Sequence, residues 1–429
     1  MKKTTAIIVI LLILLISGCT EKPVVSSERE DKDVTESNSS KSEIVIDDST
    51  EYDTEYIKFR SGLNNTYHAL TSDKELTVAY LGGSITAGAG ATDPNFSAWR
   101  PLVTQHLKNE FPSAKITEIN RGVGSAGSLL ATFYLDDKVL PHKPDLVFLE
   151  MAINDNFTVS DIERVYIQYE TIIRKLRETN PYCDIVAVFT TSDKVDATQP
   201  FLQAMAQDEV AGWYSVPSVD VGRKMRIEKK LVRPKVGDQY TPLWKKYFTD
   251  NVHPTDEGHK FYAETLIELL NKAFDVAETQ SVSKTEKKLP EKKNSELMYN
   301  LNYVETTDFD LNGCKNWQHA GEGMTFVSQI GIKNYIYTEN PDNELVYKFK
   351  GSNFYIFSSW IPSATGSEFQ YSIDGGDWVS MRGYMVYPIP IVEGLKNTEH
   401  TIKFKAGGVG SNAPTSDDKQ FKIGAFLYW

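Results

Sequence analysis

A serine, a histidine and an aspartate stand in two short segments whose residue types could perform nucleophilic catalysis. Ser84 follows two glycines in the stretch 82–86, Gly-Gly-Ser-Ile-Thr, directly after an apolar run typical of a β-strand. A serine hydroxyl is a poor nucleophile unless a nearby base accepts its proton. His253 can be that base, because Asp250, three residues earlier, can accept the Nδ1 proton and leave Nε2 facing the serine.

Each of these segments also has a purely structural interpretation. A Gly-Gly-Ser turn after a strand is common loop chemistry. Asp250 and His253 could satisfy local turn hydrogen bonds at the start of a helix, where Asp256 and Glu257 would favour the helix dipole. Taken singly, neither segment decides between structure and catalysis.

Two further segments could stabilise negative charge on a substrate oxygen. Residues 120–127, Asn-Arg-Gly-Val-Gly-Ser-Ala-Gly, form a glycine-rich turn that could point a main-chain N–H at a developing oxyanion. Asn154 could add a side-chain NH₂, and the N–H of Ser84 would complete a three-donor site. Losing one such donor typically costs ~2.7–4 kcal/mol of transition-state stabilisation. The structural alternatives are close packing at the glycines and a plain turn at Asn154.

The elements that must position these residues alternate between β-rich runs and helical stretches. We expect strands at 76–81, 115–119, 145–149, 184–189 and 218–221, and helices at 99–111, 128–135, 162–179, 199–208, 223–231 and 256–274. This alternation predicts one α/β domain over residues 57–277, with a parallel sheet covered by helices on both faces. Such sheets bind ligands beyond the carboxyl ends of their strands, where the segments above lie.

The remainder of the chain changes character. Residues 278–296 are rich in Lys, Glu, Ser and Thr and predict a linker with little to pack. From 297 to 429 strands follow one another without helical intervals, including a hairpin closed by Asp-Gly-Gly at 374–376, which predicts an all-β, jelly-roll-like sandwich. Its tryptophans could stack on sugar rings or pack in the core, and these are Trp317, Trp360, Trp378 and Trp429.

The N-terminus has the pattern of an export signal. Lys2 and Lys3 precede an unbroken apolar run over 6–16, which is shorter than the ~20 residues that span a bilayer. The sequence then resembles a bacterial lipobox, so we expect a signal peptide over 1–18 and lipid attachment at Cys19. The alternative is a plain signal peptide or an uncleaved anchor with an incidental cysteine. The acidic, Ser- and Thr-rich stretch 19–56 predicts a flexible tether.

Composition excludes several classes of function. The net charge of −12 argues against a nucleic-acid partner, because binding a polyanion needs clustered Lys and Arg. Three cysteines are too few and too scattered for a disulfide framework or a four-ligand zinc site. We therefore expect that the protein binds no metal and that Cys183 and Cys314 form no disulfide.

As a set, these segments resemble the four motifs of the SGNH (GDSL-like) hydrolase superfamily over residues 76–270. The resemblance implies a flavodoxin-like three-layer α/β/α fold, no cofactor, Ser84 as nucleophile, His253 as base and Asp250 as its orienting acid. It also implies an oxyanion hole of Ser84, Asn154 and a glycine-rich-turn N–H. Relatives often carry Gly five residues after the Asn of the second motif, where this chain has Ser125 preceded by Gly124, so either can donate.

The resemblance implies a serine esterase, and the lipobox-like motif at Cys19 predicts that it is extracellular and anchored by lipid at the outer face of the cytoplasmic membrane. An anchored catalytic domain with an accessory β-domain favours a carbohydrate O-acetyl esterase, acting on an acetylated polysaccharide or another small ester. A lysophospholipase or thioesterase of the same fold is one alternative. A surface carbohydrate-binding lipoprotein without turnover is the other.

Overall fold

The structure, a computed structural model, describes residues 55–158, 161–232, 239–280, 283–307, 309–320, 335–339, 342–358, 368–382, 388–407 and 421–429. Every described residue belongs to one compact unit of the chain, Tyr52–Trp429. Cys19, the expected signal peptide and nearly all of the expected tether lie outside the described residues. Within the described ranges, no helix combines the length and apolarity needed to cross a membrane.

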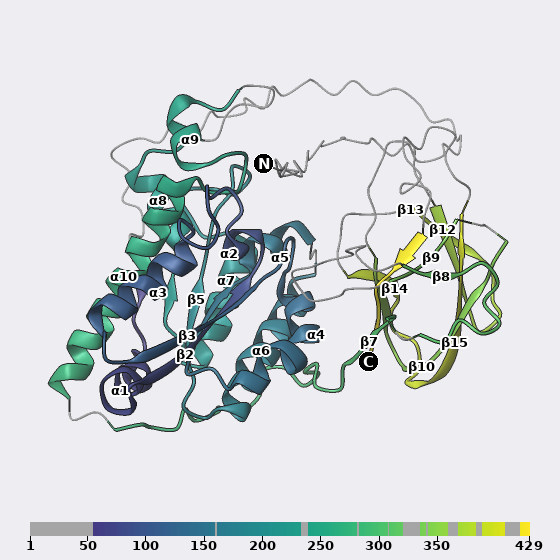
Figure 1. Cartoon of the computed structure of the whole chain (residues 1–429), viewed down its shortest axis with the longest axis horizontal. Helices are drawn as coiled ribbons and strands as arrows, with labels where there is room; N and C mark the ends of the chain where they lie inside the picture. The colour runs from purple at the N-terminus through teal and green to yellow at the C-terminus, as the bar shows by residue number, and fades with distance from the viewer. Residues whose placement is uncertain are drawn as a thin grey trace, which may run out of the picture. The chain divides into compact units, whose positions relative to one another are not determined.

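A six-stranded sheet forms the centre of the N-terminal region, in the order β1-β6-β5-β4-β2-β3 (Figure 1). Its strands are β1 (Ile57–Lys58), β2 (Glu75–Gly82), β3 (Lys115–Gly122), β4 (Leu146–Glu150), β5 (Asp184–Val188) and β6 (Ser218–Val219). Strands β2 to β6 are parallel, and β1 pairs antiparallel with β6 at one edge. The order of the five parallel strands is the flavodoxin-like one, so the predicted fold class is confirmed.

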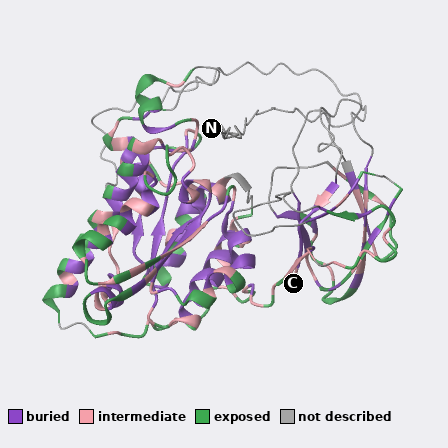
Figure 2. Cartoon of the chain, in the orientation of Figure 1, coloured by how far each residue is buried: buried purple, intermediate pink, exposed green. Residues whose placement is uncertain are grey.

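The central strands are apolar on both faces because both faces are covered. All residues of β4 and β5 are buried, and Figure 2 shows the middle of the sheet as buried throughout. Val147 and Leu149 of β4 belong to one core, whereas Phe148 between them belongs to the other. This alternation follows from the two-residue period of a strand and sends neighbouring side chains into opposite layers.

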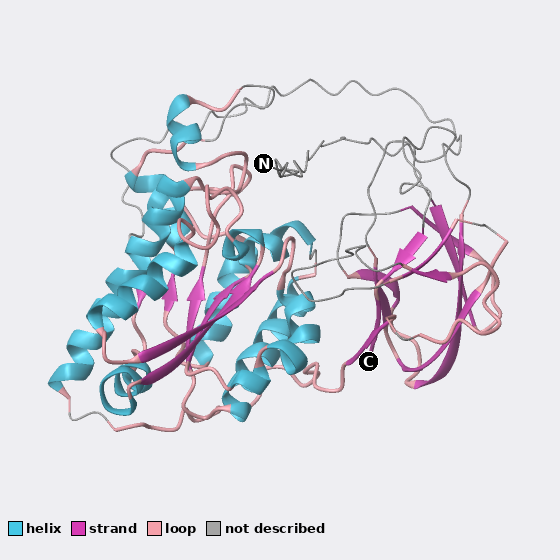
Figure 3. Cartoon of the chain, viewed as in Figure 1, coloured by secondary structure: helices cyan, strands magenta, loops and turns pink. Residues whose placement is uncertain are grey.

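Helices form the two outer layers (Figure 3). One core contains side chains of α4, α6 and α7, and the other contains side chains of α3, α8, α9 and α10. The helices are α1 (Asn64–His68), α2 (Ser84–Ala87), α3 (Trp99–Glu110), α4 (Ser128–Lys138), α5 (Ala152–Thr158), α6 (Ile162–Thr179), α7 (Leu202–Trp213), α8 (Val221–Glu228), α9 (Pro242–Tyr247) and α10 (Asp256–Thr279), with a short π-helix, η1 (Ala69–Asp73), and a 3₁₀ turn, η2 (Leu140–His142).

Side chains cap several helices, but a cap does not ensure a predicted start, because Asp220 caps α8 and that helix begins at Val221 rather than at residue 223. Asp161 accepts the N–H of Glu163 at the start of α6, and Thr255 accepts the N–H of Gly258 at the start of α10. Both helices begin where the sequence predicts. Helix α7 has no such cap and lies about three residues later than expected. The edge strand β1 and helix α9 are too short to produce a periodic signal and were not predicted.

The C-terminal region is an antiparallel β-structure, as predicted. It contains sheets of order β10-β15-β12-β13, β14-β11-β17-β7 and β16-β9-β8. The strands are β7 (Asn302–Glu305), β8 (Gln318–His319), β9 (Ile336–Thr338), β10 (Leu345–Gly351), β11 (Phe354–Phe357), β12 (Glu368–Ile373), β13 (Val379–Arg382), β14 (Ile389–Val392), β15 (Thr398–Ala406), β16 (Phe421–Ile423) and β17 (Ala425–Tyr428). Phe404 of β15 and Phe354 of β11 share one core, which identifies the two four-stranded sheets as the halves of a sandwich. The predicted hairpin is β12–β13.

The stretch between the two regions makes more contacts than its composition suggests. Lys287 N–H donates to Pro181 O over 2.7 Å, and its Nζ lies 2.7 Å from a carboxylate oxygen of Asp184. Asn294 N–H donates to Glu170 over 2.9 Å. These contacts are polar, and Leu289 adds an apolar one by packing against the core of the catalytic region.

Candidate active site

The structure brings the three predicted catalytic side chains together. Ser84 Oγ lies 2.8 Å from His253 Nε2, although the two residues are 169 positions apart. On the other side of the imidazole, Nδ1 lies 2.7 Å from Asp250 Oδ2. A hydroxyl, an imidazole and a carboxylate are thus connected in series, which is the geometry that lets a histidine take a proton from a serine.

Two glycines allow Ser84 to reach this position. Strand β2 ends at Gly82, and Ser84 is the first residue of α2. A Cβ on Gly83 would lie 1.7 Å from Asn154 Nδ2, and one on Gly82 would lie 2.5 Å from Glu150 O. The glycines are therefore required by close approach to the end of β4 and the start of α5.

A tight turn presents His253. Asp250 Oδ1 accepts the N–H groups of both Val252 and His253 over 2.8 Å. Trp244 Nε1–H donates to Asp250 O over 2.7 Å, and Thr249 N–H donates to His253 O over 2.9 Å. These bonds fix the Asp250 carboxylate relative to the imidazole before any substrate arrives.

The carboxylate of Asp250 is held in its ionised form. Partial burial alone would raise its pKa, but the hydrogen bonds from the His253 ring and from two backbone N–H groups outweigh burial. The pKa of Asp250 therefore lies below its ordinary value. An ionised Asp250 can keep the proton of His253 on Nδ1 and stabilise an imidazolium.

The predicted oxyanion segments lie next to the nucleophile turn. Ala126 N–H donates to Val123 O over 2.9 Å, which closes a turn with Gly124 and Ser125 at its centre, and Ser125 has a left-handed φ of 62°. Asn154 Nδ2 donates to Ala126 O over 2.9 Å and packs against Gly83. Asn154 thus joins this turn to the turn that carries Ser84.

Main-chain donors are available beside these side chains. Among the described residues, none accepts a hydrogen bond from the N–H of Ser84, Gly124 or Ser125. The arrangement leaves Gly124 and Ser125 as equal candidates for the second donor, as the sequence did.

Sequence reasoning missed two buried carboxyl groups under the site. Glu150, the last residue of β4, accepts hydrogen bonds from Thr86 Oγ1 (2.9 Å), Gly83 N–H (3.3 Å) and Thr190 Oγ1 (2.8 Å). Burial raises its pKa to about 7 despite these bonds. The available signal was a carboxylate at the end of the apolar run Leu-Val-Phe-Leu-Glu, because a charged residue there must find partners.

Asp155 is the second buried carboxyl group. It accepts hydrogen bonds from Ser128 N–H (2.8 Å), Ser128 Oγ (2.5 Å) and Gln207 Nε2 (2.7 Å), and burial raises its pKa to about 6. These bonds tie α5, which carries Asn154, to α4 and α7.

His259 of helix α10 is fully buried beside the site. Its Nδ1 accepts the N–H of Trp99 over 3.3 Å, and its Nε2 lies 3.1 Å from Ala89 O, to which it donates. Burial lowers the pKa of His259 to about 4, so it stays neutral. The residue ties helix α10, which follows the His253 turn, to the loop after Ser84.

The remaining candidates fall outside this site. Within the ranges that the structure describes, no three His, Cys, Asp or Glu residues are grouped to hold a metal ion, and Cys183 and Cys314 form no disulfide.

The tryptophans of the C-terminal region differ in their surroundings. Trp317 is buried in the sandwich core, and Trp429 packs against Phe133 and Tyr355. Lys405 covers the half-buried Trp378. Trp360 lies outside the described residues.

Comparison with solved structures agrees with this fold. A two-domain esterase (CEX) active on acetylated mannans matches with a TM-score of 0.67 and 18% identity, over 88% of this chain and 98% of that one. The same esterase co-crystallised with mannopentaose matches with the same TM-score, identity and coverage. The acetylxylan esterase Axe2 from Geobacillus stearothermophilus matches 46% of this chain and 94% of its own, at 19% identity and a TM-score of 0.36. At these identities the likeness to CEX shows a common fold over both regions.

Comparison at the level of sequence gives the family. No curated protein matches the chain. Residues 80–261, which include Ser84, Asn154, Asp250 and His253, match the model of the GDSL-like Lipase/Acylhydrolase family. The match of residues 80–261 to the GDSL-like Lipase/Acylhydrolase model, together with the fold shared with a two-domain esterase, identifies the chain as an ester-bond hydrolase.

Proposed function

We propose that this protein is a serine esterase that removes O-acetyl groups from a polysaccharide, with Ser84 as its nucleophile. The observation that carries the proposal is the series of contacts from Ser84 Oγ to His253 Nε2 (2.8 Å) and from His253 Nδ1 to Asp250 (2.7 Å). The fold shared with an esterase described as active on acetylated mannans supports the substrate class. That esterase is matched over both the catalytic and the β-region.

In the first half of the reaction, Ser84 Oγ attacks the acetyl carbonyl carbon while His253 Nε2 takes the hydroxyl proton. The carbonyl oxygen becomes an oxyanion, which accepts hydrogen bonds from the N–H of Ser84, from Gly124 or Ser125, and from Asn154. The bond to the sugar oxygen then breaks, and His253 gives its proton to that oxygen. The products are the free sugar hydroxyl and an acetylated Ser84.

In the second half, His253 takes a proton from water as the water oxygen attacks the acetyl carbon. The second oxyanion uses the same donors, and its collapse releases acetic acid while His253 returns the proton to Ser84 Oγ. Asp250 stays ionised throughout and stabilises the positive charge that His253 carries between the proton transfers.

Ser84→Ala tests the nucleophile. The variant should fold as the wild type does and lose at least about 10³-fold in kcat/KM on p-nitrophenyl acetate, because no covalent intermediate can form. A fluorophosphonate probe should label the wild type and leave Ser84→Ala unlabelled. Turnover in Ser84→Ala equal to that of the wild type would refute the assignment, and an unlabelled, inactive wild type would favour a binding protein without turnover.

A comparison of substrates tests which acyl group the enzyme removes and which kind of alcohol it releases. Acetate release from acetylated mannan or acetylated xylan is expected, together with a preference for p-nitrophenyl acetate over p-nitrophenyl octanoate. A preference for octanoate, or hydrolysis of lysophospholipids or acyl thioesters with no release of acetate from polysaccharide, would favour the lysophospholipase or thioesterase alternative.

We also propose that the mature protein is anchored by lipid on Cys19 at the outer face of the cytoplasmic membrane. The motif before Cys19 and the preceding apolar run support this localisation. Full-length protein should fractionate with membranes and carry a diacylglycerol mass on the peptide that begins at Cys19. Cys19→Ser should abolish both, and an unmodified wild-type peptide would refute the anchor.

A further inference from the structure

A pocket lies at the edge of the sheet opposite to the edge that carries Ser84. Ser84 follows the carboxyl end of β2, whereas this pocket lies near Asp184, the first residue of β5. Because β2 and β5 both belong to the parallel part of the sheet, these ends are on opposite edges. The pocket has a volume of about 610 Å³ and is lined by α1, the ends of α6 and α7, and the segment 285–290.

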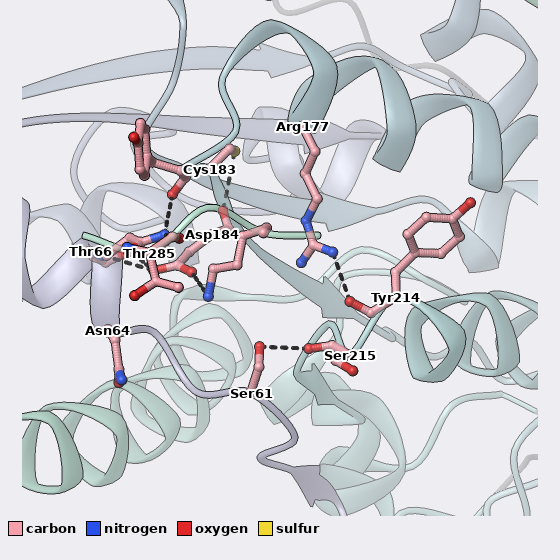
Figure 4. A network of polar contacts seen from close by, with 12 residues as sticks. Ser61, Asn64, Thr66, Arg177, Cys183, Asp184, Tyr214, Ser215 and Thr285 are labelled. Carbon is pink, nitrogen blue, oxygen red and sulfur yellow. Dashed lines mark hydrogen bonds and ion pairs between the residues drawn. The ribbon is translucent and has the colours of Figure 1, made fainter. Parts of the chain in front are cut away.

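Arg177 lines this pocket as a buried cation without a carboxylate partner. Its side chain is 3% exposed, and its Nη1 donates to Tyr214 O over 2.7 Å. Its Nε is buried with no hydrogen-bond partner. Among the described residues, no carboxylate lies within ion-pairing distance of the guanidinium, and Nη2 donates to none of them. Figure 4 shows Arg177 extending from α6 towards Tyr214, Ser215 and Ser61.

Asp184, a carboxylate whose charge acts on Arg177, is already paired with other groups. Asp184 Oδ2 accepts from the N–H and Oγ1 of Thr66 over 2.8 and 2.9 Å, and Lys287 Nζ lies 2.7 Å from its Oδ1 (Figure 4). A charge removed from water without a partner is costly, and burial accordingly lowers the pKa of Arg177. An anion bound in the pocket would remove that cost.

The other lining residues fit an anion that belongs to a sugar. Lys288 adds positive charge, the charge of Lys287 is paired with Asp184, and Glu286 is the one carboxylate among the lining residues. Trp213 is 51% exposed, and its ring is held in place because Nε1–H donates to Glu291 O over 3.0 Å. A fixed, exposed indole offers an apolar face to a sugar ring, and Ser61 and Asn64 offer polar groups to its hydroxyls.

We propose that this pocket, named here the Arg177 pocket, binds a saccharide that carries an oxyanion, either the carboxylate of a uronic acid or the phosphate of a sugar phosphate. Arg177 receives the oxyanion through Nη2, and Trp213 contacts the ring. The Arg177 pocket is separate from the Ser84 site, so binding there requires no ester in the ligand. The inference does not depend on the proposed esterase activity.

Titration calorimetry on the full chain tests binding, with glucuronic acid, glucose 6-phosphate, inorganic phosphate and glucose as ligands. Glucuronic acid or glucose 6-phosphate should bind, glucose should not, and the ligand should change the tryptophan emission of the wild type. Arg177→Gln should weaken binding at least tenfold. Trp213→Phe should remove most of the emission change, and because Trp213 is half exposed this variant should fold even if Arg177→Gln does not.

Ser84→Ala is the control that separates this site from the catalytic one. It should bind the acidic saccharide as the wild type does, and Arg177→Gln should hydrolyse p-nitrophenyl acetate as the wild type does. Wild-type affinity in a folded Arg177→Gln would overturn the proposal. So would the absence of binding by both acidic saccharides at ligand concentrations that would reveal a millimolar Kd. Equal affinity for inorganic phosphate and glucose 6-phosphate would overturn its saccharide part.

Discussion

Glu150 is the residue whose chemistry departs furthest from what its sequence position suggests. It lies beneath the turn that carries Ser84, fully buried, and three donors from two segments, residues 83–86 and Thr190, converge on it. Its hydrogen bond with Thr86 holds α2, and its bond with Gly83 holds the residue before Ser84. We therefore interpret Glu150 as a positioning residue, which acts on the reaction through Ser84.

The free energy of unfolding should depend on pH because Glu150 titrates at different pH values in the folded and unfolded states. Burial raises the pKa of Glu150 from 4.5 to about 7. Below pH 4.5 the group is protonated in both the folded and the unfolded state, and from there to pH 7 only the unfolded state ionises. The free energy of unfolding therefore falls as pH rises through this window, by about 3 kcal/mol in total, and levels off above it.

Glu150→Gln removes this titration while keeping the shape of the side chain. The difference in unfolding free energy between variant and wild type, measured by urea denaturation, should grow by about 3 kcal/mol in favour of the variant between pH 4.5 and pH 8. Glu75→Gln, an exposed carboxylate at the start of β2, is the control for the loss of one charge. A constant difference across the pH range would contradict the raised pKa.

At the scale of elements, the site depends on how closely α5 approaches the turn between β2 and α2. Asn154 occupies the space where a side chain on Gly83 would stand, so the amide and the nucleophile turn are in contact. Asp155 joins α5 to α4 and α7, because its carboxylate accepts hydrogen bonds from Ser128 and Gln207. The position of the oxyanion donors is thus set by helix packing as well as by the motifs themselves.

Gly83→Ala should separate these two elements. Its Cβ would lie 1.7 Å from Asn154 Nδ2, so the amide must move. Loss of one oxyanion donor lowers kcat by about 10²–10³-fold, and we expect kcat on p-nitrophenyl acetate to fall by at least 100-fold. Gly212→Ala on α7 is the matched control, because its Cβ would meet Arg60 at an ordinary 3.7 Å. Near-wild-type kcat in Gly83→Ala would show that Asn154 does not depend on this contact.

Ser84 and Asn154 were predictable as neighbours because each follows a strand, and parallel strands end at one edge. His253 follows helix α9 instead, and the signal there was Asp250 three residues before a candidate base. The partners of Glu150 and His259 could not be predicted, because Thr86 lies 64 positions from Glu150 and Ala89 lies 170 positions from His259. Such contacts depend on the register of β2 against β4 and on the rotation of α10, neither of which has a local signal. The burial of Arg177 could not be predicted either, because its contact with Tyr214 also joins segments that are far apart in the sequence.

At the scale of the whole molecule, the catalytic and β-regions share apolar contacts. Phe133 of α4 and Trp429 have ring centroids 5.6 Å apart, and Tyr355 and Leu427 belong to the same core as the helices of that face. Arg164 of α6 donates from Nη2 to Glu393 over 2.7 Å. A shared core implies that the two regions unfold together, since neither can leave without exposing apolar surface of the other.

Calorimetry should therefore show one transition for the wild type, with equal calorimetric and van't Hoff enthalpies. Phe133→Ala should lower the free energy of unfolding by about 3–5 kcal/mol and split the transition, because it deletes the ring that meets Trp429. Val103→Ala, in the core on the other face of the sheet, should destabilise without splitting. Two transitions in the wild type would contradict a shared core.

The long interval between Ser84 and His253 has a consequence for how the chain becomes active. A ribosome makes the serine first, and the histidine follows only after 169 further residues. Until helix α10 has docked, Ser84 carries an ordinary alcohol with no proton acceptor beside it. On the proposed mechanism, the growing polypeptide therefore cannot hydrolyse esters, and esterase activity begins only once α10 has docked.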